Sequence, residues 1–362
     1  MRPLVVVDGA GGFLGGHVVR ALLEAGYPVR AVDLPGISLD HLKTAGAQVE
    51  AFDLNRPDSL AAPLAGAGII VHLAALFDLT ATREQLFRTN VTGTENLLNA
   101  AVQLGITRFI HISSGDNYGP LQFVPATEDH PLNPLNPYAA SKVRAEEVVV
   151  REAHQHGLKT TILRPSMMYG PNSRYIACML FAVPAILVGH GVKKIPFFRG
   201  GIQFTPVHVE DVARAVVFAA DHDETAGQVY NVAQPQITTI GDLFQEIYRA
   251  IGLKIGMTIP LPKILISMIG RLGLALPDRM FAGIVNHYVA RKWAEIQQEY
   301  GLDKSFILKF NKDIFSYFIG ERAFSTERLI KAGFDYKYPT EALGIPPTIR
   351  WYVDHKWLPH VL

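Results

Sequence analysis

A glycine-rich turn near the N-terminus constrains the fold of this 362-residue chain more than any other feature. Residues 8–15 have the sequence Asp-Gly-Ala-Gly-Gly-Phe-Leu-Gly, and they connect the apolar run Leu4–Val7 to a segment with helical spacing at Phe13–Ala25. Glycine permits the tight turn, and it lets backbone N–H groups and the start of the helix approach a phosphate. A strand, a glycine turn and a helix in this order predict the first unit of a dinucleotide-binding sheet.

Short apolar runs alternate with helix-like segments through the first half of the chain. We expect buried strands at Leu4–Val7, Val29–Val32, Val49–Phe52, Ile69–Leu73, Phe109–Ile112 and Thr161–Leu163. Helices are expected between them at Phe13–Ala25, Glu84–Leu104 and Tyr138–His154. Strands alternating with helices predict an α/β fold, a doubly wound parallel sheet of the Rossmann type. Two later segments, Phe204–Val209 and Gln228–Val232, are predicted to return to this sheet.

The pattern divides the chain into two parts. We expect residues 1–172, with the returning strands at about 203–235, to form the dinucleotide-binding domain. Residues 173–202 and 236–362 are expected to form a smaller, mostly helical substrate-binding lobe.

The composition excludes several classes of protein. With 49% hydrophobic residues the chain can bury a large core, and its net charge of +1 gives no electrostatic basis for nucleic-acid binding. Cys178 is the only cysteine, which excludes an intramolecular disulfide and suits a reducing compartment. The first strand begins almost at once, so no signal peptide is expected and we predict a cytoplasmic protein. No cluster of histidines, cysteines and acids has metal-ligand spacing, so no metal site is expected.

An acidic residue, Asp33, follows the second predicted strand. A carboxylate at this position accepts hydrogen bonds from the adenosine ribose and repels a 2′-phosphate. The sequence therefore predicts NAD rather than NADP as the cofactor, although Arg30 nearby weakens the preference.

Tyr138 and Lys142 stand four residues apart in a predicted helix. Residues four apart lie on one helix face, so the lysine ammonium can lie beside the phenol. A neighbouring positive charge lowers the pKa of a phenol, which is otherwise about 10, and this enables proton transfer near neutral pH. The same spacing also occurs on exposed helix faces, so the glycine turn and the sheet around it decide the interpretation.

Several short blocks follow the glycine turn in a fixed order. They are Phe52–Leu54, Val71–Ala75, Asn90–Leu98, Leu163–Pro165, Tyr169–Pro171, Val207–Ala213, Phe324–Leu329 and Ala332–Phe334. With Tyr138 and Lys142 among them, these blocks resemble the extended short-chain dehydrogenase/reductase family, the NAD-dependent epimerase/dehydratase superfamily. The glycine motif departs from the family pattern at Asp8, where the family has a threonine.

The resemblance implies roles for named residues. It implies that Tyr138 exchanges a proton with the substrate, that Lys142 lowers its pKa and holds the nicotinamide ribose, and that Ser114 hydrogen-bonds the substrate oxygen. Ser113 is the alternative serine. The cofactor-binding residues that it implies are Gly9, Gly12, Phe13, Leu14, Gly15, Asp33, Asp53, Leu54, Leu73, Ala74, Ala75, Asn90, Tyr138, Lys142 and Pro165. It also implies a homodimer formed through the helices at 84–104 and 138–154.

Asp116 has two interpretations. It stands two residues after Ser114, where nucleotide-sugar dehydratases of the family tend to carry a glutamate, so it is a candidate acid or base for elimination. It also lies in the turn-forming sequence Gly115–Asn117, where an aspartate commonly caps the turn.

The segments expected to meet the substrate are apolar. Nucleotide-sugar members of the family place polar anchors near Met167 and Phe204, and both anchors are missing here. Since pocket lining follows ligand polarity, Met167 and Phe204 favour an apolar substrate. The strongly apolar segments Ala177–Val188 and Ile264–Leu276 also favour an apolar substrate. With them, the chain resembles the 3β-hydroxysteroid and sterol dehydrogenases of the family.

Residues 257–276 contain an amphipathic stretch in which Lys263, Ser267, Gly270 and Arg271 form a narrow polar stripe. The stretch is too short to span a bilayer. It suits peripheral contact with the inner membrane surface, and a core or dimer helix remains the alternative.

These observations favour an NAD-dependent dehydrogenase acting on a secondary alcohol or ketone of a steroid, sterol or other lipid-like substrate. A nucleotide-sugar epimerase or dehydratase is the alternative that Asp116 supports. A cofactor-binding scaffold or redox sensor without turnover is the second alternative.

Overall fold

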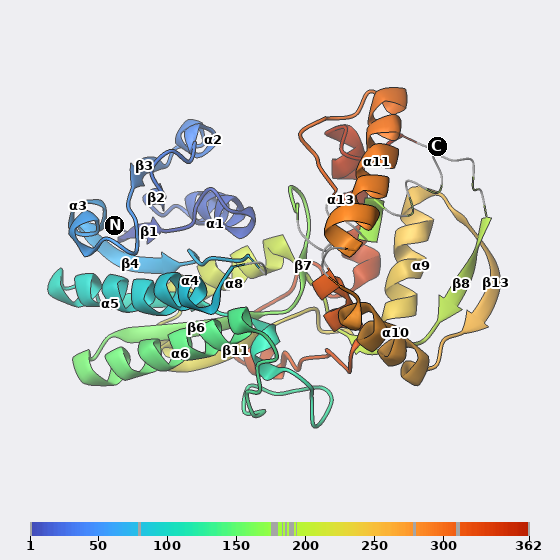
Figure 1. Cartoon of the computed structure of the whole chain (residues 1–362). Helices are drawn as coiled ribbons and strands as arrows, with labels where there is room; N and C mark the ends of the chain where they lie inside the picture. The colour runs from blue at the N-terminus through green and yellow to red at the C-terminus, as the bar shows by residue number, and fades with distance from the viewer. Residues whose placement is uncertain are drawn as a thin grey trace.

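The computed structural model describes residues 2–78, 81–174, 180–182, 184, 187, 192, 194–277, 280–308 and 312–360. At its centre lies a seven-stranded parallel sheet with the order β11-β6-β5-β4-β1-β2-β3 (Figure 1). The strands are β1 (Leu4–Val7), β2 (Val29–Asp33), β3 (Gln48–Ala51), β4 (Ala67–His72), β5 (Arg108–Ile112), β6 (Lys159–Pro165) and β11 (Gln228–Val232). The predicted α/β class is confirmed, and the strand order reverses direction between β1 and β4, where sheets of this kind bind ligands.

Helices cover both faces of the sheet. On one face, α1 (Phe13–Glu24) packs against α8 (Val209–Asp221), and they share an apolar core with β1 and β2. On the other face, α5 (Gly93–Gln103) and α6 (Pro137–His156) lie side by side over β5 and β6 (Figure 1). Burial on both faces explains why these strands have nearly continuous apolar sequences.

The helix predicted at Glu84–Leu104 consists of three pieces. It begins with α4 (Arg83–Phe87), whose capping box joins Thr82 and Gln85, continues as a π-helical turn at Arg88–Thr92, and ends with α5.

The prediction for Phe204–Val209 was wrong. This segment forms β9 (Gln203–Phe204), paired with β12 (Thr238–Thr239), and β10 (Val207–His208), paired with β7 (Met168–Tyr169), while Val209 begins α8. None of these short strands joins the seven-stranded sheet. Pro206 between them lacks an N–H group, so a continuous ladder cannot form there.

The C-terminal part contains a second apolar core, which includes Trp293, Phe306, Tyr352 and Trp357. The helices α9 (Ile240–Ile251), α11 (Asn286–Tyr300) and α13 (Glu341–Asp354) contribute to this core. The same part also contains α10 (Lys263–Ala275), whose Ile266 lies in a separate small cluster, and the parallel pair of β13 (Lys254–Pro260) with β8 (Lys194–Arg199). The short helices are α2 (Asp40–Thr44), α3 (Ala61–Leu64) and α12 (Glu327–Lys331). Most of Ala177–Val188, predicted to be a greasy segment of this part, lies outside the described residues. Within the part of the chain that the structure describes, no helix is long and apolar enough to cross a membrane.

Candidate active site

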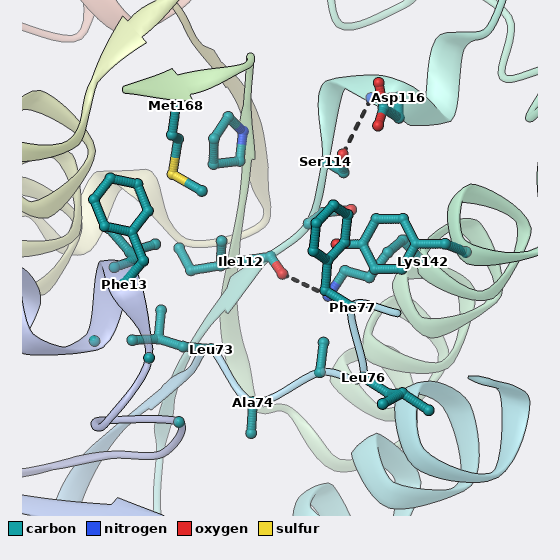
Figure 2. Close-up of a pocket in the computed structure, with 18 of the residues that line it drawn as sticks. Phe13, Leu73, Ala74, Leu76, Phe77, Ile112, Ser114, Asp116, Lys142 and Met168 are labelled. Atoms are coloured by element: carbon teal, nitrogen blue, oxygen red, sulfur yellow. Dashed lines mark hydrogen bonds between the residues drawn. The ribbon is translucent and has the colours of Figure 1, made fainter. Parts of the chain in front are cut away.

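A single cavity of about 630 Å³ brings the predicted cofactor and catalytic residues together. Its walls come from the carboxyl ends of the parallel strands, from α6, and from a distant segment near residue 320. All the site residues predicted from the sequence line this cavity except Asn90. Figure 2 shows Phe13, Leu73 and Ala74 on one side of it and Ser114, Asp116 and Lys142 on the other.

The glycine turn forms a close-packed cradle. Gly9 has φ +61°, and a Cβ atom there would lie 2.9 Å from the Ala74 nitrogen. A Cβ atom at Gly15 would lie 2.2 Å from the Gly9 carbonyl oxygen, so α1 can start this close to the turn only with glycine. The cradle places backbone N–H groups and the N-terminus of α1 along the cavity, which suits a pyrophosphate.

Asp33 lines the cavity at the end of β2. Its carboxylate accepts hydrogen bonds from the backbone N–H groups of Gly11 and Leu34, both at 2.8 Å. Arg30 turns away and donates to the carbonyl oxygens of Pro63 and Ala65 at 2.7 and 2.9 Å. The arginine that weakened the NAD prediction is therefore occupied elsewhere, and the residues present fit NAD.

Asp8, the departure from the family's glycine motif, ties two strands together. Its buried carboxylate accepts hydrogen bonds from the backbone N–H groups of Leu73 and Ala74 at 2.6 and 2.7 Å. It also contacts His72 Nδ1 at 2.6 Å. The ends of β1 and β4 are thereby held in the geometry that places Leu73–Ala75 in the cavity wall.

Lys142 is buried under the cavity with Tyr138 on the same helix. Its Nζ donates to the carbonyl oxygen of Ile112 at 2.7 Å, at the end of β5. Burial lowers the pKa of Lys142 to about 8. The pKa of the neighbouring His111 is held well below its usual value by burial and by the Lys142 charge, so this histidine stays neutral. The Tyr138 ring lines the cavity and meets Phe77 edge to face, with the ring centroids 4.8 Å apart.

Ser114 lies where β5 gives way to a 3-10 helix at Gly115–Tyr118. Its Oγ accepts a hydrogen bond from the Asp116 N–H at 3.1 Å (Figure 2). Ser113 is more deeply buried, and its hydroxyl accepts from Asn117 Nδ2 at 3.0 Å. Ser114 is therefore the more accessible of the two candidate serines.

The Asp116 carboxylate does not cap the turn. Arg322 Nη1 donates to its Oδ1 at 2.8 Å, and the Tyr317 hydroxyl lies 3.5 Å from its Oδ2. All three residues line the cavity. Arg322 and Tyr317 were not predicted from the sequence. The nearest signal was the block beginning at Phe324, two residues after the arginine.

The end of the cavity around Ser114 combines apolar side chains with the Asp116–Arg322 pair. Met167 and Phe204 line it as predicted. Leu76, Phe77, Met168 and Phe324 also line the cavity, which was not predicted from the sequence. Asn90 lies behind this wall, where its side chain accepts from the Leu76 N–H at 2.7 Å and donates to Ser141 Oγ at 2.9 Å. It supports the wall rather than facing the cavity.

The histidines and acids outside the cavity do not suggest a metal centre. No group of three or more metal-ligating side chains occurs among the described residues. His208, part of a family block, is buried, and its Nδ1 accepts from the Glu210 N–H at 3.3 Å at the start of α8. Burial lowers the pKa of His208 to about 3, so it acts as a neutral helix cap.

Comparison with known proteins agrees with this geometry. The sequence profile of the NAD dependent epimerase/dehydratase family matches residues 5–233. A dTDP-glucose 4,6-dehydratase from Streptomyces griseus is 33% identical over 70% of this chain and 80% of its own length. A 3-beta-hydroxysteroid dehydrogenase from Mycolicibacterium neoaurum is 30% identical over 69% of this chain and 71% of its own length.

The solved structures that resemble the chain include a short-chain dehydrogenase/reductase superfamily protein from Agrobacterium tumefaciens with bound NAD. It is 27% identical, with a TM-score of 0.58 over 71% of this chain and 86% of its own. The chain belongs to the NAD dependent epimerase/dehydratase family, and it is an NAD-dependent oxidoreductase of the extended short-chain type.

Proposed function

We propose that this member of the NAD dependent epimerase/dehydratase family interconverts a secondary alcohol and a ketone on a steroid, sterol or other lipid-like substrate. The observation that carries the proposal is the meeting of Ser114, Tyr138 and Lys142 with an apolar wall in one cavity. Met167 and Phe204 stand in that wall, and both lack groups that could anchor a nucleotide sugar. The similarity to a 3-beta-hydroxysteroid dehydrogenase supports the same substrate class.

In the proposed mechanism, Tyr138 accepts the proton of the substrate hydroxyl. The Lys142 ammonium favours the phenolate form of Tyr138, and Ser114 orients the substrate oxygen by a hydrogen bond. The glycine turn would hold the pyrophosphate of NAD, and Asp33 would hold its adenosine ribose. The bound cofactor would supply the acceptor for the hydride that leaves the alcohol carbon.

Turnover tests the proposal directly. The purified protein with NAD and a panel of 3β-hydroxysteroids is expected to produce reduced cofactor, measured by absorbance. Tyr138→Phe is expected to lower kcat by about a hundredfold or more while leaving NAD affinity nearly intact. The control Tyr288→Phe changes an exposed tyrosine and should leave turnover intact. Turnover of a nucleotide sugar without turnover of any steroid would contradict the substrate class, and a fully active Tyr138→Phe would contradict the mechanism.

A nucleotide-sugar epimerase or dehydratase is the second candidate. The Asp116 carboxylate in the cavity and the similarity to a dTDP-glucose 4,6-dehydratase favour it. If Asp116 acts as an acid or base in such a reaction, Asp116→Asn should abolish turnover of the nucleotide sugar. If the substrate is a lipid-like alcohol or ketone, neither wild-type protein nor Asp116→Asn should turn over the nucleotide sugar.

We keep the division into a domain of 1–172 with 203–235 and a lobe of 173–202 with 236–362 as a proposal. The apolar cluster around Trp293 and Phe306 supports a C-terminal lobe, whereas Leu329, Phe334 and Tyr336 pack into the core of the central sheet. A homodimer through the helices at 84–104 and 138–154 is likewise proposed. These segments lie next to each other on one face of the sheet (Figure 1), which is the arrangement that a shared helical interface requires.

We propose peripheral membrane contact through α10. Its buried side, with Ile266, Gly270 and Gly273, faces the core and the 3-10 helix Lys312–Phe318. Gly270 therefore does not belong to a surface polar stripe, which corrects that prediction. The opposite side exposes Ile264, Leu265, Met268, Ile269 and Leu272.

Charge supports an anionic lipid surface as the partner of α10. Residues 247–277 contain four basic residues and no acidic residue. The basic residues are Arg249, Lys254, Lys263 and Arg271. Arg249 pairs with Glu246 and Lys263 with Glu321, so the positive charge available to a lipid surface comes mainly from Lys254 and Arg271. An exposed apolar helix face in a basic segment is typical of interfacial helices. Since Tyr317 lies in the 3-10 helix that α10 covers, this contact would bring lipid close to the cavity wall.

A further inference from the structure

Two oppositely charged side chains face each other in the substrate half of the cavity. Arg322 Nη1 donates to Asp116 Oδ1 at 2.8 Å, and the two side chains are only 12% and 22% exposed. Such burial protects the pair from screening by solvent, so each charge strongly influences what can bind beside it.

The structure holds Arg322 in this position from several sides. Its backbone N–H donates to the carbonyl oxygen of Gln203 at 2.9 Å, which fixes the residue against β9. Its Nη2 donates to the carbonyl oxygen of Ser316 at 3.2 Å, and the guanidinium lies 4.6 Å from the centre of the Tyr317 ring. The guanidinium is therefore a fixed part of the wall.

The other charges of the cavity lie elsewhere. Among the described lining residues, the remaining charged side chains are Asp33, Asp53 and Lys142. Asp33 is the last residue of β2 and Asp53 follows β3, so both lie on the far side of the strand-order reversal. Lys142 is hydrogen-bonded to the Ile112 carbonyl oxygen. Within the described substrate half, the charge that a ligand meets is set by Asp116 and Arg322.

We infer that Asp116 is an internal counterion that prevents Arg322 from binding anionic ligands, so that the cavity selects uncharged substrates. An unpaired guanidinium in such a wall binds phosphates and carboxylates through paired N–H groups. Here a carboxylate already occupies that position. A diphosphate would have to displace Asp116 and then lie next to its negative charge, which is unfavourable.

A neutral ligand avoids this cost. A hydroxyl or ketone oxygen brings no charge that Asp116 would repel, and it does not require the ion pair to open. The inference deepens the proposed function and rests on it only in naming that ligand a lipid-like alcohol or ketone.

Binding of dTDP and UDP to the NAD-saturated protein tests the inference without requiring turnover. Wild-type protein is expected to show weak binding by calorimetry. Asp116→Asn, which keeps the shape of the side chain and frees the guanidinium, is expected to bind both probes at least tenfold more tightly. The double variant Asp116→Asn with Arg322→Gln should lose this gain. Asp116→Ser, a smaller replacement, should reproduce the gain if the asparagine variant fails to fold.

A matched control is available on the surface. Arg328 Nη2 pairs with Asp129 Oδ2 at 2.7 Å, and Asp129 is 78% exposed. Asp129→Asn should leave the affinity for dTDP and UDP unchanged. Equal binding by wild type, Asp116→Asn and Asp116→Ser would overturn the inference, as would tight binding by wild type that Arg322→Gln abolishes. If no lipid alcohol is turned over but Asp116→Asn still binds dTDP and UDP more tightly, the proposed substrate class is wrong. The inference that Asp116 is a counterion for Arg322 is then still supported.

Discussion

Lys142 makes the stability of the cofactor-free protein depend on pH. The side chain is 3% exposed, and burial lowers its pKa from 10.5 to about 8. In the unfolded chain the pKa returns to about 10.4. Between these values the folded state has released the proton while the unfolded state retains it. The free energy of unfolding therefore rises with pH across this interval.

The size of the effect follows from the pKa of Lys142. Each pH unit inside the interval contributes about 1.4 kcal/mol. From pH 7.5 to 9.5 the gain is about 2 kcal/mol, because the folded-state amine is still mostly charged at the lower end. Buried tyrosines act in the opposite direction only at higher pH. Burial raises the pKa of Tyr118 to about 12, so its contribution is lost once the unfolded phenol begins to ionise near pH 10.

Urea denaturation at pH 7.5, 8.5 and 9.5 without NAD measures this dependence. Wild-type protein is expected to gain about 2 kcal/mol over the series, and Lys142→Met should lack that gain because methionine carries no proton to release. Lys331→Met, which removes a lysine whose side chain is 76% exposed, should behave like wild type. The same pH dependence in wild type and Lys142→Met would refute the reasoning.

Three further changes test the cradle, the cofactor preference and the surface of α10. Gly15→Ala should abolish NAD binding measured by calorimetry, because its Cβ would lie 2.2 Å from a carbonyl oxygen of the turn. Gly16→Ala, whose Cβ would have its nearest neighbour 3.9 Å away, should bind NAD normally, and normal binding by both variants would contradict the cradle. Asp33→Ala should weaken NAD and strengthen NADP in the same assay, since the carboxylate that repels a 2′-phosphate is gone, and an unchanged ratio of the two affinities would contradict its role. Ile264→Asn should reduce binding to vesicles containing phosphatidylglycerol about tenfold, because it removes an exposed apolar side chain from α10. Ile307→Asn, at a site that is 72% exposed and outside α10, should leave vesicle binding unchanged. Equal vesicle binding by both variants would exclude α10 as the contact.

The sheet could be predicted because its strands are buried on both faces and carry the signal locally. β1 and β11 begin and end at the predicted residues, and the other five strands differ by at most two residues at either end. Phe204–Val209 failed for a physical reason. Its apolar run contains Pro206 and supplies a separate short strand on each side of it, and a run of apolar residues alone does not reveal that division.

The cofactor half of the site was also predictable, since the glycine turn and Asp33 lie within one strand–helix–strand unit. The substrate half was not. Asp116 meets Arg322 across 206 residues, and no local pattern records which distant side chain will face which. Asp8 shows a related limit. The sequence reveals that an aspartate stands where the family has a threonine, but its three hydrogen-bond partners come from the end of the neighbouring strand β4 and the residues after it, and only the structure identifies them.

The segment around Arg322 has a consequence for how the protein is made. Two sets of backbone hydrogen bonds hold it in the cavity wall. Arg322 is bonded to Gln203 of β9, and in the loop before α6 the Ala126 N–H donates to the Ala323 carbonyl oxygen at 2.9 Å. Every strand of the central sheet precedes it in the chain, ending with β11 at Val232. During synthesis from the N-terminus, the residues that hold the cofactor therefore leave the ribosome well before those that complete the substrate wall. The Asp116–Arg322 pair that we propose to select the ligand therefore forms only after every strand of the central sheet has been synthesised.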